Sequence, residues 1–85
     1  MKIYTTSKFE KEHKKLSDFL KNKTKQKEII FKNNPFDKRL KTHKLKGKYN
    51  NYWSFSVSGS HRIMFEFLAK NEVVFINIGN HSIYN

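Results

Sequence analysis

Residues 52–67 read "YWSFSVSGSHRIMFEF", and apolar and polar residues alternate along this stretch on both sides of "SGS" at 58–60. A period of two is typical of strands that bury one face, and a short segment of Ser and Gly between two such runs favours a tight turn. The stretch therefore predicts an antiparallel hairpin. Its core face is expected to carry Trp53, Phe55, Val57, Ile63, Phe65 and Phe67. Its opposite face is expected to carry Ser54, Ser56, Arg62, Met64 and Glu66.

Two further strands are predicted around this hairpin. "EVVFINI" at 72–78 follows a turn formed by "AKNE", and alternation along it places Val74, Ile76 and Ile78 on the core face and Phe75 on the opposite face. "KIYT" at 2–5 is a short strand candidate at the N-terminus.

A helix is predicted directly after the first strand. Ser7 and Glu10 have the spacing of a capping box, so we expect Ser7 to be the N-cap residue. Spacings of four, three and four then place one stripe on a single helix face. This stripe consists of Phe9, His13, Leu16 and Leu20.

The stripe lapses over "KNKTKQK" at 21–27 and resumes at 29–31. This interruption predicts two helices with a turn between Ser17 and Thr24. The second helix is expected to end before "NNP", because Pro35 disfavours helix in the residue that precedes it.

Residues 35–48, "PFDKRLKTHKLKGK", contain six Lys or Arg and one Asp. We expect a basic, partly ordered loop that Leu40 and Leu45 anchor to the body of the protein. The resulting order, β-α-α-β-β-β, predicts one α+β domain over residues 1–85, with two helices on one face of a small, mostly antiparallel sheet.

The net charge lies entirely in the first half of the chain. Residues 1–48 contain 16 Lys or Arg and 5 Asp or Glu, which gives +11, whereas residues 49–85 contain two of each. A basic region beside a neutral, aromatic half favours a polyanionic partner, with RNA or DNA the commonest. The alternative is that the lysines only keep a small protein soluble.

The chain contains no cysteine, which excludes a disulfide framework and a thiolate metal site and is typical of cytosolic proteins. No apolar run reaches the length of about 20 residues that spans a bilayer. We therefore expect a cytoplasmic protein without a membrane partner.

Five residues have side chains suited to chemistry or to phosphate binding. They are His43, His61, Arg62, His81 and Tyr84. Arg62 is expected on the sheet face away from the core, where its guanidinium would bind a phosphate in a bidentate manner. The alternative for Arg62 is a cross-strand ion pair with Glu66 or Glu72. For the histidines the alternatives are an exposed tail ring at His81 and one more cationic loop residue at His43.

These residue types suit RNA cleavage without a metal ion. Cleavage needs a base for the ribose 2′-hydroxyl, a cation for the phosphorane charge and an acid for the leaving oxygen. Two histidines and an arginine supply the three roles, since imidazole titrates close to neutral pH. The sequence has no HExxH or CxxC spacing, so we expect neither a metal nor another cofactor.

The stretch "HKLKGKYNNYWSFSVSGSHRIMFEF" and the later "VVFINIGNHSIY" resemble the RelE/ParE superfamily of bacterial type II toxins, and most closely the RelE, YoeB and YafQ mRNA interferases. The resemblance implies a β-α-α-β-β-β fold and ribosome-dependent cleavage of mRNA. It also implies a cognate antitoxin, which we expect to be acidic and partly disordered, and oligomers formed only through that antitoxin.

The resemblance also implies roles for individual residues. His43 resembles the YafQ-type histidine before the sheet, Arg62 the YoeB-type arginine, and His81 the near-terminal catalytic histidine, with Tyr84 close to the aromatic that ends such chains. The expected RNA-binding residues are Lys41, Lys44, Lys46, Lys48 and His61. At His61, YafQ-type toxins have an acid.

Two other functions are compatible with the same sequence. One is a ParE-like toxin that inhibits DNA gyrase without cleaving RNA. The other is a small RNA- or ribosome-binding protein without catalytic activity.

Overall fold

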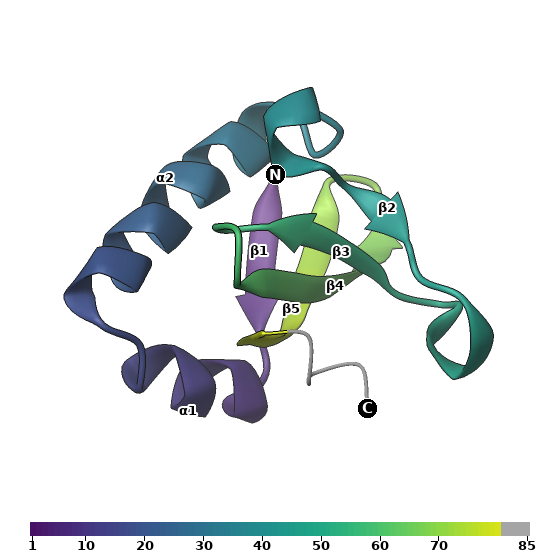
Figure 1. The fold of residues 1–85 in the computed structure, drawn as a ribbon. Helices are drawn as coiled ribbons and strands as arrows, with labels where there is room; N and C mark the ends of the chain where they lie inside the picture. The colour runs from purple at the N-terminus through teal and green to yellow at the C-terminus, as the bar shows by residue number, and fades with distance from the viewer. Residues whose placement is uncertain (81–85) are drawn as a thin grey trace.

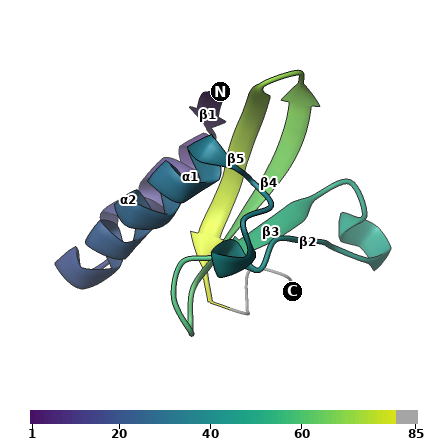
Figure 2. The same ribbon diagram turned by 90° about the horizontal axis from the view of Figure 1, so that it is seen from above.

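The computed structural model describes residues 1–80, and in it two helices lie on one side of a five-stranded sheet (Figure 1). The view from above shows both helices on the same side of the sheet (Figure 2). In chain order the elements are β1 (Lys2–Thr5), α1 (Ser7–Lys14), α2 (Asp18–Asn33), the 3₁₀ turn η1 (Lys38–Leu40), β2 (His43–Lys44), the 3₁₀ turn η2 (Gly47–Tyr49), β3 (Trp53–Ser56), β4 (Arg62–Ala69) and β5 (Glu72–Gly79).

The strands are ordered β1-β5-β4-β3-β2 across the sheet. β1 runs parallel to β5, and the other neighbouring pairs are antiparallel. The predicted α+β class and the placement of the helices are confirmed. β2 was not predicted, because two residues are too few to show a period; His43 pairs with Ser54 and Lys44 with Trp53 inside the segment expected to be a loop.

The N-cap residue of the first helix lies one residue earlier than the capping box predicts. Its N-cap residue is Thr6, whose Oγ1 accepts a hydrogen bond from the backbone N–H of Phe9 at 3.0 Å. The same hydroxyl donates to the carbonyl oxygen of Ile76 at 2.6 Å. Thr6 therefore both caps α1 and attaches it to β5, a tertiary contact that the local Ser7–Glu10 pattern does not reveal.

The turn between the helices also lies earlier than predicted. α1 ends at Lys14, and Ser17 caps α2 by accepting from the N–H of Leu20 at 3.2 Å. α2 then continues through 21–27, because Thr24 occupies the buried face there and is only 3% exposed. Its hydroxyl donates to the carbonyl oxygen of Leu20 at 2.8 Å. A polar residue thus occupies the buried helix face in a segment where the lapse of the apolar stripe had predicted a turn.

Phe31 of α2 lies at the centre of the core and is 0% exposed. Three rings on the helix-facing side of the sheet surround it at centroid distances of 4.8, 4.9 and 5.5 Å. They belong to Phe55, Phe65 and Phe75. The core predicted for the β3–β4 hairpin is confirmed at Phe55, Val57, Ile63 and Phe65, whereas Trp53 is only partly buried and Phe67 is exposed.

The prediction for β5 was wrong in its first half. Val73 and Phe75 enter the core, whereas Val74 and Ile76 are only half-buried. The cause is an irregularity opposite β4, where Met64 pairs with Asn77 but the next residue, Phe65, pairs with Phe75. The extra residue breaks the period of two, so that Ile78 returns to the core face as predicted.

Leu40 is fully buried and anchors the basic segment as expected, and Leu45 is half-buried. Within residues 1–80, no helix is both long and apolar enough to cross a membrane.

Candidate functional site

The sheet face turned away from the helices carries two rows of mostly polar cross-strand partners. In one row His43, Ser54, Met64 and Asn77 are successive cross-strand partners. In the next row Ser56, Arg62 and Gly79 are partners. Cross-strand partners share a face of a sheet, so the structure brings His43 and Arg62 onto the same face, although 18 residues separate them in the sequence.

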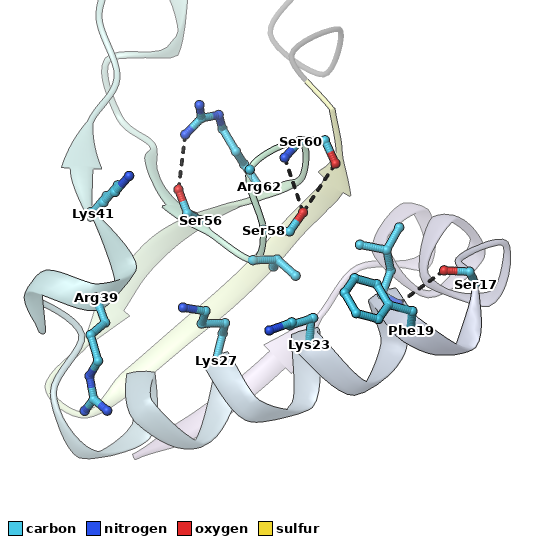
Figure 3. Close-up of a pocket in the computed structure, with 13 residues that line it drawn as sticks. Ser17, Phe19, Lys23, Lys27, Arg39, Lys41, Ser56, Ser58, Ser60 and Arg62 are labelled. Carbon is cyan, nitrogen blue, oxygen red and sulfur yellow. Dashed lines mark hydrogen bonds between the residues drawn. The ribbon is translucent and has the colours of Figure 1, made fainter.

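Arg62 begins β4 and is half-buried. Its Nη1 donates to Ser56 Oγ at 3.3 Å (Figure 3). The alternative ion pair with Glu72 is disfavoured by the register, because Glu72 pairs with Ala69 at the other end of the hairpin, roughly 23 Å from Arg62 along the strand. Glu66 also lies four residues away on β4 itself rather than on a neighbouring strand.

His43 is exposed on β2, and its Nδ1 lies 3.1 Å from the carbonyl oxygen of Lys41. A carbonyl oxygen only accepts hydrogen bonds, so Nδ1 carries the hydrogen in this contact. The neutral ring then presents the lone pair of Nε2. Lys41 adopts a left-handed conformation, with φ at 53°, and this turn aims its carbonyl group at the ring.

The separation of His43 and Arg62 follows from the register. Two strand spacings and two residues along a strand place their Cα atoms roughly 12 Å apart. Both side chains are long enough to approach one phosphodiester group from opposite sides of that gap. The pair therefore consists of a candidate base, His43, and a candidate phosphate-binding cation, Arg62, both within reach of one phosphodiester group.

His61 lies outside this arrangement. It precedes β4 at the tip of the hairpin, and its Nδ1 lies 2.8 Å from Ser60 Oγ. The carbonyl oxygen of His61 closes the turn by accepting from the N–H groups of Val57 and Ser58 at 2.9 and 3.2 Å. His61 therefore has a structural role in the hairpin turn.

The four lysines predicted to bind RNA do not form one cluster. Lys44 pairs with Trp53 and so shares the helix-facing side of the sheet. Lys46 caps η2, and the Nζ of Lys48 lies 5.2 Å from the ring centroid of Tyr49. Of the four, Lys41 is the one that lines the hollow described next.

A hollow of about 800 Å³ lies between α2 and the tip of the β3–β4 hairpin. Its lining consists of Ser17, Phe19, Leu20, Lys23, Lys27, Arg39, Lys41, Ser56, Val57, Ser58, Gly59, Ser60 and Arg62. Lys23 and Lys27 point from α2 toward the hairpin (Figure 3). The sequence alone does not distinguish these two lysines from the others on α2, although their spacing of four residues places them on one helix face.

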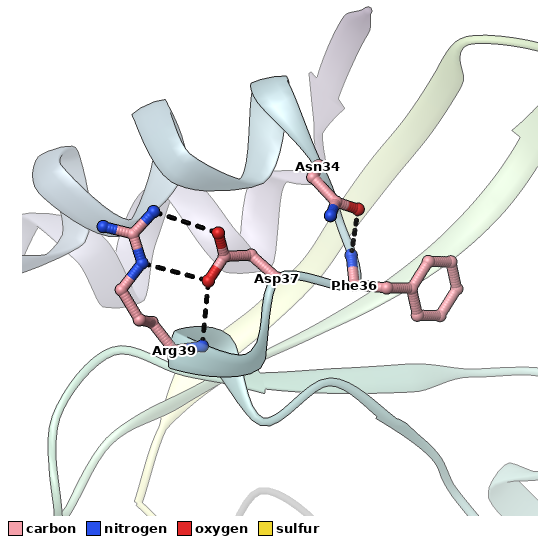
Figure 4. Close-up of polar contacts among 4 residues, drawn as sticks. All are labelled: Asn34, Phe36, Asp37 and Arg39. Carbon is pink, nitrogen blue, oxygen red and sulfur yellow. Dashed lines mark hydrogen bonds and ion pairs between the residues drawn. The ribbon is translucent and has the colours of Figure 1, made fainter.

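Arg39 also lines the hollow, but its charge is compensated. Its Nε and Nη2 donate to the two carboxylate oxygens of Asp37 at 3.0 and 2.9 Å (Figure 4). The backbone N–H of Arg39 donates to the same carboxylate at 2.9 Å. These hydrogen bonds lower the pKa of Asp37 to about 2, and the carboxylate raises the pKa of Arg39.

His81 and Tyr84, which were predicted to complete the site, lie outside the described residues. Within residues 1–80, no group of three His, Asp or Glu side chains is arranged to hold a metal ion.

A family model described as "Bacterial toxin of type II toxin-antitoxin system, YafQ" matches residues 1–84 of this chain. No curated protein sequence matches the chain.

Several solved structures share the fold. YafQ from E. coli strain BL21(DE3) superposes with a TM-score of 0.75 at 22% identity, covering 96% of this chain and 94% of that one. A YoeB/ParE toxin from Agrobacterium tumefaciens gives a TM-score of 0.80 at 21% identity, with 95% and 99% covered. The RelB–RelE antitoxin–toxin complex from Methanococcus jannaschii gives 0.74 at 23% identity, with 95% and 94% covered.

Proposed function

The chain belongs to the YafQ family of bacterial type II toxins, and we propose that it is a ribosome-dependent endoribonuclease that cleaves mRNA without a metal ion. The observation that carries this proposal is that His43 and Arg62 share one face of the sheet, with Nδ1 of His43 in contact with the carbonyl oxygen of Lys41.

In the proposed reaction, a histidine removes the proton from a ribose 2′-hydroxyl. The resulting oxygen attacks the adjacent phosphorus, and the bond to the 5′-oxygen of the next nucleotide breaks. A second histidine gives that oxygen a proton, which leaves a 2′,3′-cyclic phosphate and a 5′-hydroxyl. His43 and His81 share the base and acid roles in this proposal, Tyr84 assists them, and Arg62 stabilises the phosphorane.

The charge distribution supports a ribosomal setting. Sixteen of the 18 basic residues lie in residues 1–48, which form the helices and the segment preceding β3. Phosphates of folded RNA attract such a surface without requiring a particular base sequence. Lys44 in β2, Lys46 directly before η2 and Lys48 within η2 are proposed to contact ribosomal RNA.

The proposed partner that silences the toxin is an antitoxin. One relative was solved as a RelB–RelE antitoxin–toxin complex, and a net charge of +11 on this chain favours an acidic, partly disordered segment as the inhibitor. Cytoplasmic location follows from the proposed target.

Single substitutions test the proposal. Arg62→Ala and His81→Ala should abolish growth inhibition and cleavage of translated mRNA, and His43→Ala should weaken both. Lys70→Ala is the matched control, because it removes the other cation of residues 49–85 from the turn far from Arg62.

Three outcomes would contradict the proposal. The first is that Arg62→Ala and His81→Ala remain as active as the original chain. The second is DNA damage signalling with intact mRNA, which would indicate a ParE-like gyrase inhibitor. The third is unimpaired growth when the chain is expressed without an antitoxin, which would favour a non-catalytic RNA-binding protein.

A further inference from the structure

Cations line the hollow between α2 and the hairpin, and none of its lining residues is Asp or Glu. Lys23, Lys27 and Lys41 lie among the lining residues, and Arg62 lines it on the hairpin side. The fifth cation, Arg39, is compensated by Asp37. Lysines converging on one hollow repel one another, so an anion placed among them is stabilised.

Hydroxyl groups lie on the wall opposite the lysines. Ser56, Ser58 and Ser60 alternate along the hairpin. Ser58 Oγ accepts from the backbone N–H of Ser60 at 3.3 Å (Figure 3). It also accepts from the N–H of His61 at 3.2 Å, and the two hydrogen bonds order the tip. Such hydroxyls are common donors to phosphate oxygens.

An exposed ring borders the same hollow. Phe19, in the first turn of α2, is 65% exposed, and the Nζ of Lys23 lies 5.7 Å from its ring centroid. By contrast, the exposed Phe36 packs against the rings of Trp53 and Phe67. Phe19 thus presents a ring face next to cations, the combination with which proteins bind single-stranded nucleic acids.

The hollow also connects with the candidate catalytic face. It is lined by Val57, which belongs to the core, and by Ser56 and Arg62, which belong to the polar face. Arg62 therefore borders both the outer sheet face and the hollow.

We propose that this hollow is a binding subsite for single-stranded RNA next to the cleaved phosphate, with a base stacked on Phe19 and phosphates bound by Lys23 and Lys27. The identity of the strand as RNA rests on the proposed function. An acidic peptide is the competing occupant, and the experiment separates the two.

The test is equilibrium binding of a short, fluorescently labelled 2′-O-methyl RNA, which cannot be cleaved through its 2′-oxygen, over a series of salt concentrations. The double variant Lys23→Gln with Lys27→Gln should bind about tenfold more weakly, and its salt slope should fall by about 1.4. The matched control is Lys21→Gln with Lys25→Gln, the same charge change with the same spacing on α2 but outside the lining. It should change binding less than twofold. Thermal unfolding of each variant confirms that it is folded.

Phe19→Ala should weaken binding about fivefold or more, and Phe19→Trp should preserve it, because stacking depends on an aromatic face. An RNA backbone of the same length without bases should not respond to Phe19→Ala. Equal losses for the two lysine pairs would overturn the proposal. So would RNA binding that is insensitive to Phe19→Ala, or variants that lose affinity only for poly-glutamate.

The outcomes distinguish an error in the proposed subsite from an error in the proposed function. If the original chain binds RNA in the predicted manner but does not cleave mRNA, the catalytic proposal is wrong and the subsite remains. If it cleaves mRNA while the Lys23/Lys27 variant binds and cleaves normally, the subsite alone is wrong.

Discussion

The two faces of the β3–β4 hairpin are built from alternate residues of the same strands, yet they have different environments. On the helix side, Phe55 and Phe65 pack against Phe31 and are fully buried. On the other side, Ser56 and Arg62 are half-buried and hydrogen-bonded to each other. The helix side therefore carries the aromatic core, and the other side carries Arg62, which is proposed to act in catalysis.

This separation means that substitutions one residue apart should affect different properties. A large side chain lost from the helix side should lower stability, whereas a cation lost from the polar side should lower activity. The predictions below test that separation, beginning with the largest expected effect.

Phe31→Ala should lower the free energy of unfolding by about 3–5 kcal/mol, because it removes a fully buried ring and leaves a cavity between α2 and the sheet. Chemical denaturation measures the loss. Phe36→Ala is the control, since Phe36 is 55% exposed, and its effect should be much smaller. Similar losses for the two variants would show that the helix side is not the main source of stability.

Arg62→Ala should leave the free energy of unfolding within about 0.5 kcal/mol of the original value. Its rate of mRNA cleavage should fall roughly 100-fold or more, as happens when a group that stabilises transition-state charge is removed. Arg62→Lys should recover only part of the rate, because an ammonium lacks the planar fork of a guanidinium. If Arg62→Ala were much less stable but its folded fraction cleaved mRNA at the original rate, Arg62 would be a structural residue and not a catalytic one.

Thr6→Val should cost about 1–2 kcal/mol of stability, because it removes the α1 cap and the hydrogen bond to Ile76 together. Thr6→Ser keeps the hydroxyl and should retain most of the stability. Thermal unfolding of both variants measures the difference. Cleavage should be unchanged in each, since Thr6 attaches α1 to β5 away from Arg62; a selective loss of cleavage would contradict the separation.

Gly47→Ala should cost about 1 kcal/mol, because Gly47 has a φ of +70° that is unfavourable for residues with a Cβ. An added Cβ at Gly47 would meet no atom within 4 Å, so the cost is a backbone effect. Gly59→Ala in the hairpin turn is the matched control, since its added Cβ is equally unobstructed and no left-handed φ is involved. Denaturation curves for the two variants should differ accordingly, and identical curves would refute the backbone argument.

The smallest expected effect is on the pH dependence of stability, and it comes from Asp37, which lies on neither sheet face. Its pKa is lowered from 3.8 to about 2 by the hydrogen bonds from Arg39. Because the pKa is lower in the folded state, the ionised Asp37 stabilises the folded protein at pH values above 3.8. This stabilisation is lost as the pH falls from 3.8 through about 2. Asp37→Asn should therefore flatten a small decline in melting temperature between pH 4 and pH 2, and Arg39→Gln should do the same. An unchanged pH profile in both variants would contradict this.

The hairpin could be predicted from the sequence because its alternation is strict. Phe55, Ile63 and Phe65 are in the core and Arg62 is on the opposite face, as the period of two requires. The same rule failed at Phe75, because the irregular pairing with β4 is set by a neighbouring strand and leaves no local signal.

The helical layer was less predictable for a related reason. Thr24 is buried, and its hydroxyl donates to the carbonyl oxygen of Leu20. The apolar periodicity of the sequence does not identify a polar residue as part of the buried helix face. Thr6 caps α1 through a contact with β5 that is remote in sequence.

For the site, residue types were informative and alternation placed Arg62 on the outer face, but no pattern in the sequence placed His43 on that face. His43 and Arg62 were selected by their chemistry, and the pairing of β2 with β3 then placed them on one face. Lys23 and Lys27 were missed because lysines on a helix usually face only solvent. Their proposed role depends on the hairpin tip, which lines the same hollow.

The most direct test of the catalytic account is to map 5′ ends of cellular mRNA after induction, for the original chain and for Arg62→Ala, with and without a block of translation. The account predicts new ends with 5′-hydroxyl groups inside translated frames. These ends should appear only with the original chain and only while translation proceeds. Ends that persist with Arg62→Ala, or that are unaffected when translation is blocked, would contradict it.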